Sequence, residues 1–303
     1  MFTFAGKLHI NNFSCIMANV IKIKKGLDIN LKGKASDVLL NGGKSESYAI
    51  VPDYYNGILP KVVAKVGEKV KAGSVLMIDK NRPEIKFVSP VSGEVTAVNR
   101  GEKRKVLSIV VKPDAQIEYE EFGKKNVASL QGAEVKEVLL NAGMWPFIKQ
   151  RPYDIVAAPL DTPRDIFVSA FYSAPLAPNF DFIVKGQEAD FQTGLNALAK
   201  LTNGKVYVGV RSGSVVSGVK GVEIVEVEGP HPAANVGVQI NHIKPVNKGE
   251  VVWTVNPADV IVIGRLFNKG VADFSRMVAI TGSETTESFD RYQGEYGWLP
   301  RRL

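Results

Sequence analysis

Residues 61–112 read KVVAKVGEKVKAGSVLMIDKNRPEIKFVSPVSGEVTAVNRGEKRKVLSIVVK, and this stretch decides the fold of the N-terminal part of the chain. Short runs of apolar, mostly β-branched residues alternate with Gly or Pro, as in Val75–Ile78 after Gly73 and Val106–Val111 after Gly101. Such spacing is typical of short strands joined by tight turns and not of helices. The stretch therefore predicts a small, closed β unit.

Two parts of this stretch, residues 67–73 (GEKVKAG) and 89–95 (SPVSGEV), resemble the two facing hairpins of biotinyl and lipoyl carrier domains. In those flattened barrels a carrier lysine lies at the tip between the hairpins. Here the tip, residues 78–86 (IDKNRPEIK), offers Lys80 but no Met-Lys-Met or Asp-Lys-Ala triplet, and Pro83 favours a rigid turn. We predict the carrier fold without carrier chemistry. A protein that bears biotin or lipoate on Lys80 is the alternative.

Length and composition restrict the remaining possibilities. A chain of 303 residues predicts two or three domains, and without an apolar run near 18 residues it predicts no membrane span. The single cysteine, Cys15, excludes a disulfide framework and a cysteine-based zinc or iron–sulfur site within one chain. With only three histidines besides, we predict no metal site.

Positive charge is concentrated in the N-terminal part. Residues 1–112 hold 19 Lys and Arg against 9 Asp and Glu, whereas residues 113–303 hold 19 against 22. This predicts either a solvated lysine-rich domain or a face held against anionic lipid or an acidic partner. Nucleic acid is not expected, because aromatic residues are not interleaved with the lysines. Alternation within residues 20–34 predicts a strand with one solvated basic face, or equally the start of a segment that winds along the barrel. We predict that Lys22, Lys24 and Lys25 dock on the membrane or on another protein of an assembly.

The chain as a whole is expected to be α+β, with a biotinyl/lipoyl-like β-barrel domain followed by a Rossmann-like α/β domain. From residue 164 onward, strand patterns at 165–170, 205–210 and 222–227 alternate with helix patterns at 187–202 and 257–270, which predicts a parallel sheet. Neither G-x-G-x-x-G nor a Walker A sequence occurs, so a flavin- or nucleotide-binding reductase is only an alternative. The predicted divisions are a dispensable extension (1–19), a basic β domain (20–113), a helical or irregular connection (114–163), the α/β domain (164–282) and an atypical tail expected to be disordered (283–303).

The loop Gly229-Pro230-His231-Pro232 follows the last of these strands and precedes a helix predicted over residues 233–242. Ligands of open α/β sheets bind at the carboxyl ends of strands, and a helix N-terminus offers N–H groups to a carbonyl oxygen. We therefore predict a small-molecule site at Gly229, Pro230, His231 and Pro232, with Asn235 in the first turn of the helix. The alternative is that His231 is a structural turn residue. No Ser/His/Asp or Cys/His arrangement occurs, so no catalytic residue is predicted.

Three segments together resemble the A-type subunit of the sodium-translocating NADH:quinone oxidoreductase (Na⁺-NQR). They are residues 21–34 (IKIKKGLDINLKGK), 79–111 (DKNRPEIKFVSPVSGEVTAVNRGEKRKVLSIVV) and 229–267 (GPHPAANVGVQINHIKPVNKGEVVWTVNPADVIVIGRLF). The resemblance implies a peripheral subunit, on the cytoplasmic side of the bacterial inner membrane, of a respiratory complex that oxidises NADH, reduces ubiquinone and exports Na⁺. Family members continue past Gly282, whereas this chain ends with SETTESFDRYQGEYGWLPRRL, which we interpret as a truncation or a shifted reading frame.

The same resemblance implies which roles fall to this chain and which to the other subunits of the complex. This chain is expected to bind quinone and to support assembly, without a catalytic residue or a tightly bound cofactor of its own. FMN, FAD, riboflavin and the iron–sulfur centre are expected on partner subunits, which include integral membrane flavoproteins.

Overall fold

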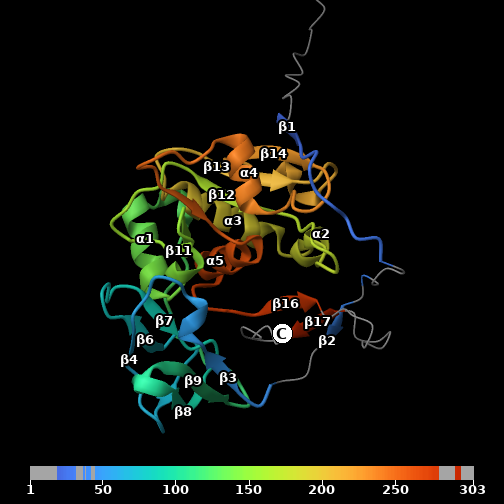
Figure 1. Cartoon of the computed structure of the whole chain (residues 1–303). Coiled ribbons are helices and arrows are strands. Elements are labelled where there is room, and N and C mark those ends of the chain that lie inside the picture. Colours follow the sequence, from blue (N-terminus) through green and yellow to red (C-terminus); the bar gives the residue numbers. More distant parts are fainter. Residues whose placement is uncertain (1–18, 32–36, 38, 42–44, 280–290, 295–303) are drawn as a thin grey trace, which may run out of the picture.

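The computed structural model describes residues 19–31, 37, 39–41, 45–279 and 291–294. Figure 1 shows a β domain and an α/β domain, one above the other, with a small additional sheet beside them. One continuous apolar core runs through both domains, from Ile109 in the first to Trp145 and Val208 in the second. Trp145 and Phe147, in the short η4 turn (Trp145–Phe147), are buried where the two domains meet.

The β domain consists of two facing sheets, which confirms the predicted small β unit. Its strands are β3 (Tyr48–Ile50), β9 (Val106–Pro113), β8 (Gly93–Arg100) and β5 (Lys69–Val70) in one sheet, and β4 (Pro60–Val62), β6 (Val75–Asp79) and β7 (Lys86–Val88) in the other. The alternating apolar residues of the sequence fill the space between the sheets. Leu76, Ile85 and Ile109, for example, are fully buried there.

The turn between β6 and β7 is the position of the carrier lysine in the domains that this unit resembles. The buried Asp79 carboxylate accepts hydrogen bonds from the backbone N–H of Leu59 (3.1 Å) and from Arg82 Nε (2.8 Å). Arg82 also donates to the carbonyl oxygens of Gly57 (2.8 Å) and, in the α/β domain, Val156 (3.2 Å). The turn is therefore fastened to the neighbouring domain. This geometry favours a structural turn over a hairpin offered to a ligase.

The α/β domain is built on a seven-stranded sheet in the order β1-β14-β13-β12-β15-β10-β11. The first five strands of this order are mutually parallel, as the alternation of strand and helix patterns predicted. Strand β10 runs antiparallel to β15, and β11 runs antiparallel to β10. The strands are β1 (Asn19–Lys22), β14 (Glu223–Glu228), β13 (Val206–Val210), β12 (Ile166–Ser169), β15 (Val252–Thr254), β10 (Lys149–Arg151) and β11 (Ile155–Val156).

Helices cover both faces of this sheet. Successive residues of β12 point to opposite sides, so that Val168 joins the core shared with α3 and α5 while Phe167 packs against Ile240 of α4. A Cβ on Gly194 would lie 2.0 Å from the carbonyl oxygen of Val260, so α3 and α5 touch backbone to backbone. The helices are α1 (Gly132–Asn141), α2 (Phe180–Val184), α3 (Glu188–Ala199), α4 (Val236–Ile243) and α5 (Pro257–Lys269).

Two elements differ from the sequence-based expectation. Residues 20–22 belong to β1 and extend the α/β sheet beside β14, although the sequence grouped residues 20–113 with the β domain. Alternating apolar residues predict a strand but not the sheet that it joins, and Ile23 is buried with Val225 and Val227. In the tail, β17 (Arg291–Gly294) pairs with β16 (Arg276–Ala279) and β2 (Leu40–Asn41), where no strand pattern was found. The predicted extension up to residue 18 and the rest of the tail lie outside the described residues.

Candidate functional site

The loop predicted to bind a ligand lies against the end of β12. The Oγ of Ser173, just beyond β12, is 3.1 Å from His231 Nδ1 and accepts a hydrogen bond from the backbone N–H of Ala234. Ser169, at the end of β12, donates from its Oγ to the Ala234 carbonyl oxygen at 2.8 Å and accepts from Gln239 Nε2 at 2.9 Å. Two serines thus clamp the loop and the start of α4 onto the carboxyl edge of the sheet.

The other side of the same loop is covered by the segment that follows β1. The backbone N–H of His231 donates to the Asp28 carboxylate at 2.8 Å, and its carbonyl oxygen accepts from the N–H of Leu27 at 2.9 Å. Gly229 has a φ of +126°, and a Cβ there would lie 2.2 Å from the carbonyl oxygen of Ile23. Glycine is therefore required at position 229, because the backbone at Ile23 comes too close to leave room for a side chain.

The structure brings Gly229, Pro230, His231 and Pro232 together, as their adjacency in the sequence dictates, and places Asn235 differently. Asn235 is the exposed N-cap of α4, which begins at Val236, because two backbone turns at 230–235 precede the helix. Within the described part of the chain, the His231 ring has one hydrogen-bond partner, through Nδ1. The imidazole is half-buried, and within the described residues Nε2 takes part in no hydrogen bond, so this nitrogen is available to a ligand.

The three lysines predicted to dock lie at the α/β end of the molecule. Lys22 forms an exposed ion pair with Glu228 (3.4 Å), whereas Lys24 and Lys25 are exposed beyond the end of β1. Figure 1 shows β1 at the opposite end from β8 and β9 of the β domain. The docking lysines are therefore separate from the basic β domain.

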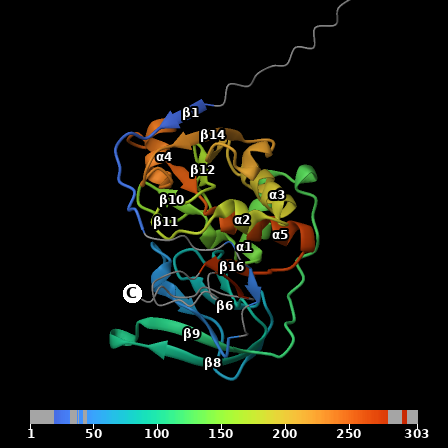
Figure 2. The ribbon, with the colours of Figure 1, turned by 90° about the vertical axis from the view of Figure 1, so that its right-hand side faces the viewer.

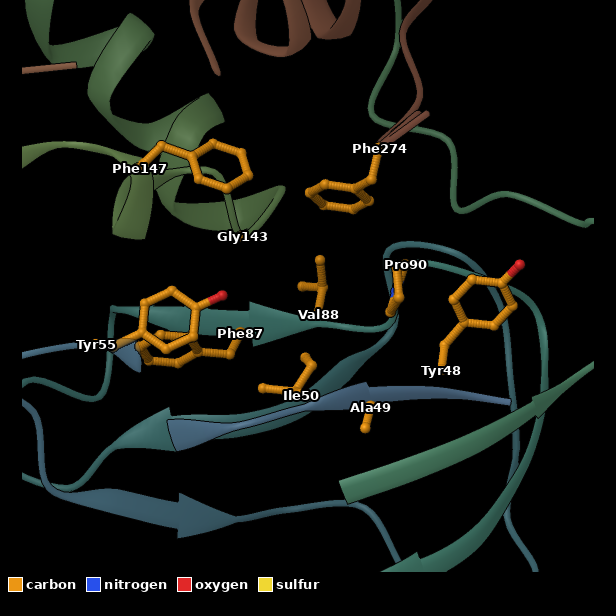
Figure 3. A pocket seen from close by; sticks show the side chains of 10 residues that line it. All are labelled: Tyr48, Ala49, Ile50, Tyr55, Phe87, Val88, Pro90, Gly143, Phe147 and Phe274. Carbon is orange, nitrogen blue, oxygen red and sulfur yellow. The ribbon is translucent and has the colours of Figure 1, made fainter. Parts of the chain in front are cut away.

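A cavity that the sequence did not indicate opens where the two domains meet (Figure 3). Its enclosed volume of about 30 Å³ holds roughly two water molecules. Five aromatic rings line the cavity, and four of them form two pairs: Tyr55 packs edge-on against Phe87 at 4.6 Å, and Phe147 against Phe274 at 6.1 Å. The lining residues are Tyr48, Ala49, Ile50, Tyr55, Phe87, Val88, Pro90, Gly143, Phe147 and Phe274.

Ionisable groups contact this aromatic wall. Arg276 stacks over the ring of Phe147 at 5.7 Å and binds the buried Asp259 carboxylate through Nη2 at 3.0 Å. The ammonium group of Lys149 lies 5.2 Å from the centre of the Tyr55 ring. The wall therefore carries two cation–π contacts, on Tyr55 and on Phe147, and the cation on Phe147 is paired with a buried carboxylate.

Burial shifts the pKa values of these groups in the direction of their neutral forms. It raises the pKa of Asp259, against the opposing effect of Arg276, and it lowers the pKa of Lys149. Burial, with a further contribution from Asp259, also raises the pKa of Tyr55 and takes that of Tyr172 to about 12. Perturbed ionisable groups around an apolar cavity are typical of ligand sites.

The cavity is linked to the point at which the strand order of the sheet reverses through Asp259, whose partner Arg276 stacks on Phe147 of the cavity wall. Going outward from β12, the chain places β13 and β14 on one side and then β15 on the other. Tyr172, after β12, donates to Asn256 Oδ1, after β15, at 3.3 Å, and Asp259 lies in the first turn of α5. Open α/β sheets bind ligands at this carboxyl-edge switch point. Sequence spacing does not reveal strand order, so it gives no sign of this site.

Two other kinds of functional feature are not found in the described residues. No group of three or more His, Cys, Asp and Glu side chains is placed there to hold a metal ion. None of the helices given above is long and apolar enough to cross a membrane.

Comparison with known proteins assigns both domains. The family model for the NqrA N-terminal barrel-sandwich hybrid domain matches residues 21–114, and that for the NqrA second alpha/beta domain matches residues 130–272. The chain thus contains a barrel-sandwich hybrid domain followed by an α/β domain.

Relatives match most of the chain. It is 39% identical over 268 residues, 87% of its length, to the A-type subunit of the Na(+)-translocating NADH-quinone reductase of Hahella chejuensis, of which it covers 60%. The proteins of the same name from Neisseria meningitidis serogroup A and Photorhabdus laumondii are each 37% identical over 88% of the chain. The chain spans about 60% of the length of these relatives. With both domains matched in order and relatives of one name, the chain belongs to the NqrA family, the A-type subunits of Na⁺-translocating NADH-quinone reductases.

Proposed function

We propose that the chain is a peripheral subunit, on the cytoplasmic side of the membrane, of a complex that oxidises NADH, reduces quinone and exports Na⁺. The names of the relatives and the order of the two matched domains support this assignment. Partner subunits, among them integral membrane flavoproteins, would hold the FMN, FAD, riboflavin and iron–sulfur centre. This chain would then act through binding and assembly and not through a redox centre of its own.

We infer that the α/β domain is Rossmann-like in its topology. If the strands are numbered along the chain from β12, then β14, β13, β12 and β15 lie side by side in the order three, two, one, four. This is the first part of the strand order of doubly wound dinucleotide-binding sheets. The loop after β12 (residues 170–175, AFYSAP) lacks the glycine-rich phosphate fingerprint. The switch point is therefore suited to a ligand without a pyrophosphate group.

A quinone headgroup is the ligand whose chemistry the lining of the domain-junction cavity matches best. It is an uncharged, planar ring with two carbonyl oxygens, and the cavity supplies stacking aromatic faces together with the phenol of Tyr55 and the nearby ammonium group of Lys149 as hydrogen-bond donors. Phe274 and Tyr48 stand at one side of the cavity in Figure 3. Because the enclosed volume is about 30 Å³, a ring enters only when this aromatic wall moves outward.

The loop with His231 is the second position that we propose for the headgroup. Its half-buried imidazole leaves Nε2 without a hydrogen bond within the described residues, and Asn235, the N-cap of α4, follows four residues later in the chain. Whenever Nε2 carries a proton, this atom can donate to a quinone carbonyl oxygen.

Binding of a short-chain, water-soluble ubiquinone analogue to two variants separates the two positions. Ile50→Phe puts an additional ring into the cavity and is expected to weaken binding at least tenfold, while His231→Ala leaves binding within twofold. The reverse result places the headgroup at the loop. Equal binding by the parent chain and both variants would exclude both positions, and thermal unfolding checks that each variant is folded.

We further propose that Lys24 and Lys25 contact an acidic face of another protein of the complex. Both are exposed, and within the described residues neither takes part in an ion pair, in contrast to Lys22. Such a contact weakens as salt screens the charges. Replacing both lysines by Gln should reduce retention of the membrane subunits at low salt and have little effect at high salt.

A further inference from the structure

The charge of the basic β domain is concentrated at the tip of the β8–β9 hairpin. The six residues 100–105 (RGEKRK) contain four basic side chains and one acidic side chain, and all of them except Gly101 are exposed. Figure 2 shows the two strands running outward from the domain to this tip. Each strand has eight residues, and β8 ends on two exposed residues, Asn99 and Arg100.

The tip is an ordered turn. The backbone N–H of Gly101 donates to the Lys105 carbonyl oxygen at 2.9 Å, and Nη1 of Arg100 donates to the Arg104 carbonyl oxygen at 3.1 Å. Lys103 and Arg104 have φ values of +52° and +62°, in the left-handed region that side chains disfavour. Two long cationic side chains are thus held at a turn where glycine or asparagine is the usual choice.

These cations are largely free of local counter-charges. Lys105 forms an ion pair with Asp53 at 2.7 Å, and Glu102 is the single acidic residue of the tip. In the part of the chain that the structure describes, Arg100, Lys103 and Arg104 take part in no ion pair. The neighbouring Leu107 and Tyr54 are 43% and 41% exposed, so apolar and amphipathic side chains flank the charges.

We propose that this hairpin tip contacts the anionic phospholipid surface of the membrane, with Arg100, Lys103 and Arg104 binding lipid phosphate groups. The proposal rests on the peripheral membrane function proposed above. A protein partner usually requires an interface of about 1,000 Å² or more, which a narrow turn does not offer. A charged bilayer attracts each basic residue near its surface without such burial, and each contributes about fivefold in affinity.

The position of the tip selects which end of the molecule faces lipid. Figure 1 places β8 and β9 at one end and β1, next to Lys24 and Lys25, at the other. One flat bilayer cannot contact both ends. Lys103 with Arg104, and Lys24 with Lys25, are therefore two pairs of exposed cations of equal charge that differ in their predicted access to the membrane.

The test is sedimentation of the full 303-residue chain with vesicles of phosphatidylglycerol and phosphatidylcholine, compared with phosphatidylcholine alone. Binding should require the anionic lipid and should weaken with salt. Lys103→Gln with Arg104→Gln should reduce affinity about 25-fold, whereas Lys24→Gln with Lys25→Gln should change it less than twofold. Thermal unfolding of both double variants controls for folding. Three results would each overturn the proposal: binding that does not depend on the charge of the lipid, an equal loss of affinity in the two double variants, or no binding at all.

A second readout separates this proposal from the assignment of the chain to the complex. If the Lys103/Arg104 variant loses the membrane subunits in a pull-down while the parent chain does not bind vesicles, the tip binds protein and the lipid proposal is wrong. The membership of the complex would still hold in that case. If the parent chain retains no membrane subunits, the proposed function fails whatever the vesicles show.

Discussion

The guanidinium of Arg82, in the β domain, donates a hydrogen bond of 3.2 Å to the carbonyl oxygen of Val156, in the α/β domain. The same guanidinium holds the carboxylate of Asp79, which is buried at the base of the β6–β7 turn. One side chain therefore both neutralises a buried charge and joins the two domains. The turn that carries the prosthetic group in carrier domains has here become part of a domain interface.

Arg82→Ala should destabilise the protein by about 3 kcal/mol, because it leaves the Asp79 carboxylate buried without its cation. Equilibrium unfolding in urea measures the change. Lys80→Ala is the control, since this neighbouring side chain is exposed, and it should alter stability by less than about 0.5 kcal/mol. Equal effects of the two substitutions would show that the Arg82 contacts contribute no stability.

Lys80→Arg should leave the covalent mass of the purified chain unchanged apart from the substitution itself. The β6–β7 turn is fastened to Gly57 and Val156 and lacks a ligase motif, so no biotin or lipoate is expected on Lys80. Intact-mass spectrometry of both proteins measures this. An adduct present on the parent chain and absent from the variant would establish the carrier alternative.

Asp165→Asn should destabilise the protein by about 2 kcal/mol at neutral pH. Burial alone would raise the pKa of Asp165, but Lys244 (2.8 Å), the backbone N–H of Lys205 and Arg164 (2.7 Å) outweigh it and hold the pKa below its usual value. A lowered pKa in the folded state gives stability that is complete above the unfolded-state pKa and is lost as the pH falls through the folded-state pKa.

The destabilisation by Asp165→Asn should therefore shrink in acid, between about pH 4 and the lower pKa of the folded state. Urea unfolding of the parent chain and the variant across this range gives the difference directly. A difference that stays constant or grows as the pH falls would contradict the ion-pair network as its source.

Gly229→Ala should destabilise the α/β domain by more than about 2 kcal/mol, because a Cβ there would lie 2.2 Å from the carbonyl oxygen of Ile23 at a φ of +126°. Gly237→Ala, in α4, is the control: no atom lies within 4 Å of the added Cβ, and alanine favours the helix by up to about 1 kcal/mol. Thermal unfolding should show the two variants shifted in opposite directions. A Gly229→Ala protein as stable as the parent chain would mean that the segment after β1 does not pack on this loop.

Local patterns in the sequence are sufficient to predict most of the elements. Phe191, Leu195 and Leu198 recur at helical spacing and form the buried face of α3, and Asn256-Pro257 begins α5 with an Asn side-chain cap, as such residues predict. The predicted start of α4, at 233, is three residues too early. The turns at 230–235 use backbone hydrogen bonds that no side-chain pattern reports.

Long-range placement cannot be predicted in the same way. The apolar alternation around Ile21 and Ile23 fits either sheet, and only pairing with Val225 and Val227 of β14 decides between them. The candidate site at the domain junction depends on the same information. Tyr55 and Asp259 belong to different domains, and no spacing in the sequence indicates that burial and charge couple them.

The loop at His231 shows both what local patterns predict and what depends on long-range placement. Its position after β14 and before a helix follows from the sequence, and it lies on the carboxyl edge of the sheet. The strand order, however, places the reversal between β12 and β15, next to Tyr172 and Asn256. The loop is also occupied on one side by Asp28, which the sequence places about 200 residues earlier.

Purification of the tagged chain from native membranes under mild detergent, followed by identification of the retained proteins, tests the proposed membership of the complex most directly. The proposal predicts that the integral membrane flavoprotein subunits of a Na⁺-translocating NADH-quinone reductase are retained, and that Lys24→Gln with Lys25→Gln lowers their yield at low salt. Recovery of the chain without these subunits, under conditions that keep the remaining complex intact, would contradict it.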